Sequence, residues 1–186
     1  MKSGRYVVPF DVSRSPVEII QGWHGPYSHF DLESRYGVNI DSSYAIDFKL
    51  PLETPVFAAC AGNVIVVYTE SVVYYNGDDG NVGNQLPAGS TNFLVIDHGD
   101  GTFALYSHLH HRSEYVRTKQ SVDQGQLLAG TGLSGWIGQN PHLHFAVFRR
   151  VPREQPASGL LAPKAVTIPF RFQNYGGPYE HSELRM

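Results

Sequence analysis

Short apolar runs separated by turn residues dominate the chain from residue 44 to residue 148. Most of the runs are rich in β-branched or aromatic side chains and end at Gly, Pro, Asn or Asp, as β-strands do. The runs are YAIDF (44–48), TPVFAACAG (54–62), NVIVVYT (63–69), NFLVIDHG (92–99), TFALYSHL (102–109) and PHLHFAVF (141–148). This pattern predicts an all-β fold, with antiparallel sheets that form a sandwich or half-barrel.

Polar or glycine-rich segments surround these runs. Residues 1–42 are rich in Gly, Pro and Ser, which favours a long irregular loop. Residues 74–90 contain four of the 19 glycines and predict an exposed hairpin excursion. HGDGT (98–102) predicts the tight turn of a hairpin, and TIPFRF (167–172) predicts one edge strand in the tail. No repeat or linker divides the chain, so we expect a single domain over residues 1–186.

Charge and cysteine content exclude several classes of function. The chain has 14 basic and 17 acidic residues, and a net charge of −3 gives no electrostatic reason to expect a nucleic-acid partner. Cys60 is the only cysteine, so any metal must be bound by His, Asp or Glu. The sequence begins MKSGRYVVPFDV, which predicts no signal peptide, and no apolar stretch of about 20 residues predicts a membrane span.

The histidines suggest the chemistry of a metal site. In a β-strand residues i and i+2 point the same way, so His142 and His144 of PHLHF share one face. A catalytic zinc site keeps three protein ligands, and without cysteine two histidines and one carboxylate are the natural set. Asp47 lies inside the apolar run YAIDF, where a charge is costly unless it is paired or bound to metal. Asp97 is the weaker candidate, because an Asp before His-Gly is typical of a turn.

Spacing argues against the common alternatives for an HxH pair. Cupin sites place a carboxylate a few residues after HxH, but here the first one after His144 is Glu154, ten positions on. The zinc-protease motif HExxH is absent. LSGWIG (133–138) lacks the GxSxG form of a serine nucleophile, so serine hydrolysis is disfavoured.

Three motifs, in order, resemble the lysostaphin- and LytM-type zinc endopeptidases, which cut peptidoglycan cross-bridges. YAIDFKLPLETPVFAACAGNVIVV (44–67) is similar to the family's aspartate segment and the strand pair after it. DHGDGTFALYSHL (97–109) is similar to the hairpin that leads to its YxHL motif, and NPHLHF (140–145) to its final motif. The resemblance implies a zinc-dependent endopeptidase with an open groove between long loops.

The resemblance extends over about residues 20–148 and leaves 1–19 and 149–186 as irregular extensions. It implies that the loops 22–43 and 74–90 form the walls of the groove. Their aromatic residues are candidates to grip a substrate, and they are Trp23, Tyr27, Tyr74 and Tyr75.

Individual roles follow from the resemblance, one residue at a time. Asp47 and His144 correspond to zinc ligands, and His142 and His108 correspond to the two catalytic histidines, with His142 favoured as the base. The family's first ligand commonly stands four residues before the aspartate, but that position here is Ser43.

The missing ligand must therefore come from elsewhere in the chain. SHFD (28–31) resembles a branch of the family in which the histidine lies further upstream, so His29 is our choice and His24 the alternative. A second departure is Glu53, which occupies a position that the family usually gives to Gly.

The implied function is hydrolysis of peptide cross-links in peptidoglycan, with one Zn²⁺ per chain and a periplasmic, secreted or cell-wall location. The partner is then a peptidoglycan peptide. The alternative is a non-catalytic relative on the same fold that binds cell wall or regulates another hydrolase.

Overall fold

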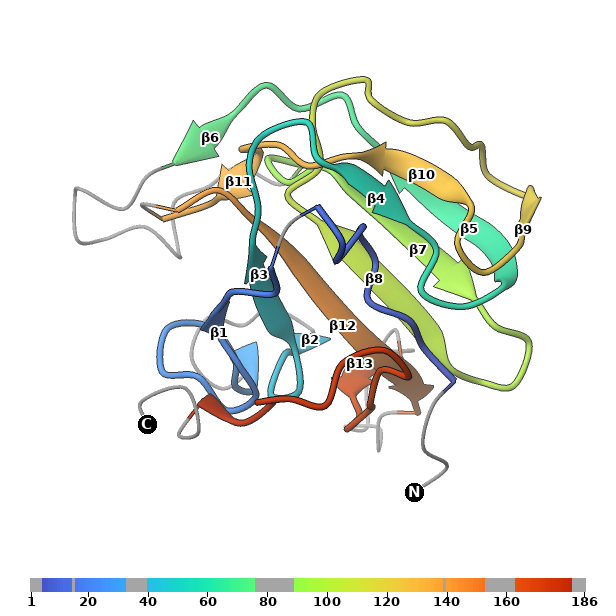
Figure 1. Cartoon of the computed structure of the whole chain (residues 1–186). Helices are drawn as coiled ribbons and strands as arrows, with labels where there is room; N and C mark the ends of the chain where they lie inside the picture. Colours follow the sequence, from blue (N-terminus) through green and yellow to red (C-terminus); the bar gives the residue numbers. More distant parts are fainter. Residues whose placement is uncertain are drawn as a thin grey trace, which may run out of the picture.

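The computed structural model describes residues 5–14, 16–32, 40–75, 89–138, 140–152 and 163–181 (Figure 1). These residues contain strands and no helix long and apolar enough to span a membrane. The strands are β1 (Ile19–Gln21), β2 (Ile40–Asp41), β3 (Ile46–Lys49), β4 (Pro55–Phe57), β5 (Gly62–Tyr68), β6 (Tyr74–Tyr75), β7 (Phe93–Asp97), β8 (Phe103–Ser107), β9 (Ser121–Val122), β10 (Leu127–Gly130), β11 (Gly135–Trp136), β12 (His142–Val151) and β13 (Lys164–Thr167).

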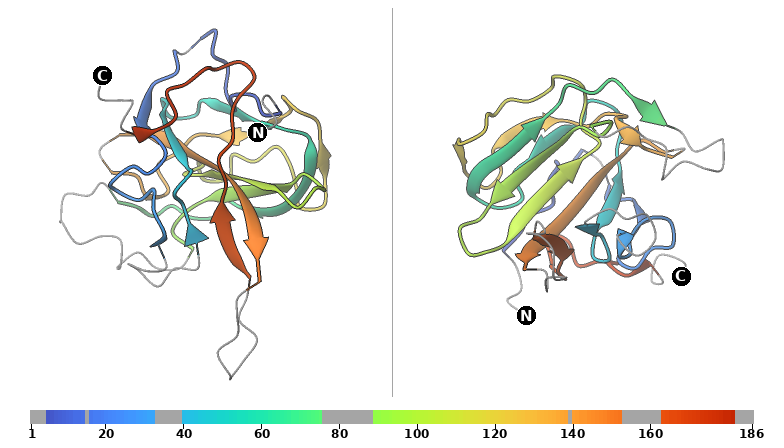
Figure 2. Two further views of the ribbon diagram at one scale, coloured as in Figure 1. Left: turned by 90° about the horizontal axis from the view of Figure 1, so that it is seen from below. Right: turned by 180° about the vertical axis from the view of Figure 1, so that it is seen from behind.

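Nine of the strands form one large sheet. Its main path is β1-β3-β12-β8-β7-β5-β9, and all neighbours on this path are antiparallel. β3 pairs with the first part of β12, and β13 pairs with its last part, from Phe148 to Val151. β2 pairs with β13 in parallel. β4 and β10 form a small antiparallel sheet that lies over one face of the large one, as Figures 1 and 2 show. The all-β prediction with antiparallel sheets is confirmed, and the small β6–β11 pair is parallel.

The hydrophobic core fills the space between the two layers. Along β12, Leu143, Phe145 and Val147 alternate into this core and are fully buried, whereas His142 and His144 lie on the other face. The hydroxyl of Tyr106 in β8 accepts a hydrogen bond from the backbone N–H of Ala59, which follows β4. Burial of each large apolar side chain is worth roughly 1.5–3 kcal/mol, so the alternation fixes which face of β12 carries the histidines.

Both ends of the chain pack more closely than expected. The terminal segments were expected to be irregular, but β12 extends to Val151 and β13 pairs with it. The expected edge strand 167–172 lies earlier, at Lys164–Thr167. Six aromatic or apolar side chains from the two ends are buried in the core, and they are Tyr6, Val8, Phe10, Phe170, Phe172 and Tyr179. An isolated bridge between Tyr6 and Phe172 joins the ends, a non-local contact with no sequence periodicity.

The two loops expected to flank a groove are described only in part. Residues 33–39 and 76–88 lie outside the described residues. Trp23 lies in the described part of the loop 22–43. Its indole is buried against Tyr44 and Tyr179. The prediction that Trp23 grips a substrate is therefore wrong, because the aromatic residues of the terminal segments enclose its ring.

Candidate metal centre

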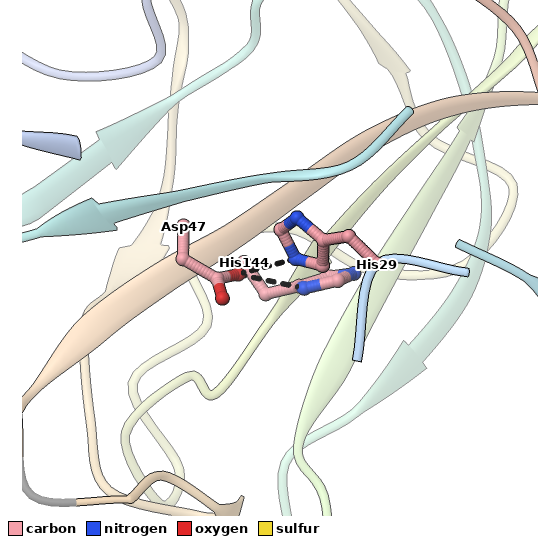
Figure 3. Close-up of side chains that lie close together, drawn as sticks. All are labelled: His29, Asp47 and His144. Atoms are coloured by element: carbon pink, nitrogen blue, oxygen red, sulfur yellow. Dashed lines mark hydrogen bonds and ion pairs between the residues drawn. The ribbon is translucent and has the colours of Figure 1, made fainter. Parts of the chain in front are cut away.

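His29, Asp47 and His144 come together beside the large sheet (Figure 3). Asp47 and His144 are direct cross-strand partners on β3 and β12, so their side chains meet on one face. Nδ1 of His144 lies 2.8 Å from Oδ1 of Asp47, and Nε2 of His29 lies 3.2 Å from the same oxygen. The potential ligand atoms of the three residues all lie within 4.8 Å of one another. This is the set of residues that the sequence predicted as ligands.

The tautomer of His29 is set by its surroundings. Its Nδ1 lies 2.8 Å from the carbonyl oxygen of Gly22, which can only accept, so Nδ1 carries the proton and donates it. In a neutral ring Nε2 is then an acceptor, and it is buried without a hydrogen-bond partner. A bare acceptor buried beside a carboxylate is unfavourable, and a cation between the two would relieve the repulsion. The donor set therefore fits a metal ion.

His24, the alternative to His29, lies apart from this cluster. It is exposed, and its ring packs edge-on against Tyr44 with 4.8 Å between the ring centroids. Its backbone adopts a φ of 57°, which suits a turn in the loop. Of the two candidates, the structure brings His29 to Asp47.

His108 and His142 form a second pair next to the cluster. Their ring centroids lie 4.6 Å apart, and Nε2 of His142 lies 3.8 Å from Oδ1 of Asp47. Nδ1 of His108 donates to the carbonyl of Ser134 at 2.7 Å, and Nδ1 of His142 donates to that of Asn140 at 2.8 Å. In a neutral ring each Nε2 is then unprotonated and able to accept a proton.

His108 directly follows β8, and its backbone is in a left-handed conformation. The φ of 64° costs a non-glycine residue roughly 1–2 kcal/mol. The hydrogen bond from the ring to Ser134 and the ring contact with His142 hold the side chain in this position. Backbone strain of this kind is often found at functional sites.

Burial and charge shift the pKa values in opposite directions. Burial raises the pKa of Asp47, but the imidazoles of His29 and His142 and the hydrogen bond from His144 outweigh it, so the pKa lies well below its usual value. Burial lowers the pKa of His108 to about 3, helped by the neighbouring imidazoles of His142 and His144. Burial also lowers the pKa of His144, against the opposing effect of Asp47. The cluster therefore combines an ionised carboxylate with two rings, His108 and His144, whose neutral forms are favoured by burial, and a deprotonated carboxylate and a neutral imidazole are the forms that bind a metal.

Asp47, His108, His142 and His144 line a pocket of about 550 Å³, and His29 is fully buried behind them. One wall comes from the first loop and β1, through Ile20, Gln21, Tyr27 and Ser28. The other comes from β11 and the turn after it, through Trp136, Ile137, Gly138 and Asn140. The expected wall at 22–43 is thus present in part, whereas Tyr74 and Tyr75 do not line the pocket among the described residues.

Sequence reasoning missed two groups of residues in this site. Gln21 donates to Oδ2 of Asp47 at 2.9 Å, yet it lies in a segment that the composition indicated as irregular. The run VEII before it is rich in β-branched residues and was the available signal for a strand. The wall residues Trp136 and Ile137 stand in LSGWIG, which the sequence presents only as an incomplete serine motif, because nothing local shows that β11 approaches the histidines.

Comparison with known proteins agrees with this arrangement. The family model described as peptidase family M23 matches residues 41–156. The cell division protein DipM of Caulobacter vibrioides is 27% identical over 148 residues, which cover 77% of this chain and 21% of that protein. The peptidoglycan DD-endopeptidase ShyA of Vibrio cholerae is 32% identical over 127 residues, which cover 66% of this chain and 24% of that protein. The matched parts are thus about a fifth to a quarter of these relatives.

Solved structures show the same fold. A zinc-containing peptidase from Vibrio cholerae superposes with a TM-score of 0.50 and 26% identity, over 78% of this chain and 36% of that one. A catalytic-domain mutant of the prophage-encoded M23 protein EnpA from Enterococcus faecalis superposes with a TM-score of 0.50 and 21% identity, over 78% of this chain and 88% of that one. The family model covers more than half of the chain, and the chain therefore belongs to peptidase family M23.

Proposed function

We propose that the chain is a zinc-dependent endopeptidase that hydrolyses peptide cross-links of bacterial peptidoglycan, with His29, Asp47 and His144 as ligands of one Zn²⁺. The family supports peptidase activity, and the relative ShyA is named a peptidoglycan DD-endopeptidase. The observation that carries the proposal is the buried Nε2 of His29, which lies 3.2 Å from Oδ1 of Asp47 without a hydrogen bond.

Two imidazole nitrogens and one carboxylate oxygen suit zinc, and the open pocket beside them leaves room for a water and a substrate. Zinc bound by these residues supplies Lewis acidity, which lowers the pKa of water towards 7 and polarises the scissile carbonyl. The carbonyl of Gly22 fixes the ring of His29, and Gln21 holds the second oxygen of Asp47, so that Oδ1 remains directed at the imidazoles.

His142 is the general base in this proposal. Its Nδ1 is held by the carbonyl of Asn140, so Nε2 is free to take the proton of the attacking water and to return it to the departing amine. The bond from Nδ1 of His108 to the carbonyl of Ser134 likewise leaves Nε2 of His108 as a second acceptor. The ring centroids of His108 and His142 lie 4.6 Å apart. Both rings are oriented before substrate binds, which reduces the entropy lost in reaching the transition state.

The substrate is a peptide of the cell wall, and we therefore propose a periplasmic, secreted or cell-wall location. The exposed ring of Tyr27 and the side chains of Ile137 and Trp136 offer apolar contact area along the pocket. No Lys or Arg lines the pocket among the described residues, so the described lining offers no Lys or Arg to pair with an acidic group of the peptide.

The test combines metal analysis with digestion of defined cross-linked muropeptides. We expect one zinc per purified chain, cleavage of the cross-link, loss of cleavage after chelation and recovery on addition of zinc. Zinc binding without cleavage of any muropeptide would support the non-catalytic alternative. A chain that takes up no zinc would contradict the proposal.

A further inference from the structure

Gln21 is a buried amide with hydrogen bonds at both ends. Its Nε2 donates to Oδ2 of Asp47 at 2.9 Å and to Oγ of Ser28 at 3.0 Å. Its Oε1 accepts from the backbone N–H groups of Tyr27 and Ser28, at 2.9 and 3.1 Å. The residue is 3% exposed, so these four bonds replace the water that the amide would otherwise bind.

The backbone places this side chain next to the carboxylate. Gln21 and Asp47 are cross-strand partners in the antiparallel pair of β1 and β3, and a register shift occurs between Ile19 and Gln21. A bulge of this kind commonly redirects a side chain next to a functional site. The amide thus lies between β3 and the loop that follows β1.

Gly25 gives the amide its space. A Cβ atom on Gly25 would lie 2.2 Å from Cγ of Gln21, well inside van der Waals contact. The N–H of Gly25 also donates to the carbonyl of Gly22, which is the carbonyl that binds Nδ1 of His29. The tight turn 22–25 therefore serves both Gln21 and His29.

We propose that Gln21 is a positioning residue that couples two of the three ligands to the pocket wall. It holds Asp47 directly, and through the backbone of Ser28 it holds the position of the adjacent His29. The same two N–H bonds fix Tyr27 and Ser28, which line the pocket. This inference rests on the proposed zinc site, and it adds that metal binding and the substrate wall depend on one amide.

The first test is Gln21→Met, which keeps the length of the side chain and removes all four hydrogen bonds. We expect zinc affinity, measured with zinc alone in competition with a chelator, to fall about 10–100-fold, the usual effect of losing a residue that orients a ligand. With zinc saturating, we expect KM for a muropeptide to rise more than kcat falls, because Tyr27 and Ser28 lose their acceptor.

The matched control is Gln124→Met. Nε2 of Gln124 donates to the carbonyls of Arg5 and Ala59, each at 2.8 Å, on the turn between β9 and β10. This variant loses two hydrogen bonds from an exposed amide far along the chain from the proposed ligands, and we expect unchanged zinc affinity and KM. A merely structural role for Gln21 would lower the melting temperature of the metal-free protein and leave zinc affinity equal to that of the control, and this result would overturn the inference.

A second set of variants guards against poor folding of Gln21→Met. Gly25→Ala displaces the Gln21 side chain without changing any ligand, and we expect it to weaken zinc binding as well. Because both changes act through the same amide, the double variant Gln21→Ala/Gly25→Ala should bind zinc no more weakly than the single variant Gln21→Ala, from which the amide is already absent. Losses that add, or full zinc affinity in Gly25→Ala, would overturn the coupling.

The outcome also separates this inference from the proposed function. A wild-type chain that binds no zinc contradicts both. A wild-type chain that binds zinc but cleaves no muropeptide contradicts only the endopeptidase activity, and the chelator competition then still decides the role of Gln21.

Discussion

Strand β8 has a partly buried histidine near each end, and the two have different surroundings. His98 lies in the turn before β8, with Nδ1 3.0 Å from Oγ1 of Thr102. His108 directly follows β8, with Nδ1 2.7 Å from the carbonyl of Ser134. Burial lowers the pKa of His98 to about 4 and that of His108 to about 3. By burial and pKa alone the two would be equal candidates for a functional residue.

The nearby carboxylates distinguish the two ends. At the hairpin, Asp100 accepts hydrogen bonds from Thr102 and pairs with Arg5; these contacts outweigh burial and lower its pKa to about 2. Its partners are local or exposed, and the hairpin does not line the large pocket. At the other end Asp47 meets imidazoles from the first loop and from β12. The lowered pKa values of the two histidines therefore report burial. Convergence of donors from separate elements in a pocket indicates a site.

The largest effect expected from this contrast is that of His144→Ala. Removal of a proposed ligand should abolish both zinc binding and hydrolysis, since two remaining ligands hold zinc poorly. His98→Asn at the hairpin should keep both. Metal analysis and muropeptide digestion of the two variants provide the check, and retention of zinc by His144→Ala would contradict the ligand assignment.

A second pair of variants tests the source of the first ligand. We expect His29→Ala to lose zinc, because Nε2 of His29 faces Oδ1 of Asp47, whereas His24→Ala should retain it, because its ring packs on Tyr44. Zinc content after gentle purification is the measurement. The opposite result would transfer the ligand role to His24 and leave the remaining mechanism unchanged.

The next-largest expected effect is a fall in kcat in variants that still bind zinc. His142→Ala and His108→Ala should each retain zinc, while kcat falls by about 10²–10⁴, the usual scale for a general acid or base. Steady-state kinetics together with metal analysis separates this result from ligand loss. If His142→Ala lost zinc and His144→Ala kept it, the two roles within the HLH motif would be exchanged.

The central strands were predictable because each has one buried face. Alternation in PHLHFAVF places Leu143, Phe145 and Val147 in the core and turns His142 and His144 away from it. The terminal segments were not predictable in the same way. Their buried aromatic residues lie on irregular backbone, where no period of two or 3.6 marks them as core.

The candidate site shows the same division. Asp47 and the HLH motif stand out as polar residues within apolar runs, and the structure brings them together. Gln21 and the wall at Trp136 and Ile137 became evident only from long-range contacts. Glu53, at the position where the resemblance implied a glycine, adopts a left-handed φ of 59°.

The smallest expected effect isolates the hairpin histidine. His98 has a pKa of about 4 in the folded chain, below its ordinary value of 6.5, so the unfolded chain binds its proton first as the pH falls. Its contribution to stability is complete above pH 6.5 and is lost progressively as the pH falls towards 4. We therefore expect the metal-free wild type to lose stability more steeply over this range than His98→Asn, in denaturant unfolding at matched pH values. Parallel curves would show that the pKa of His98 is not lowered in the folded state, and His98 and His108 would then differ in pKa as well as in geometry.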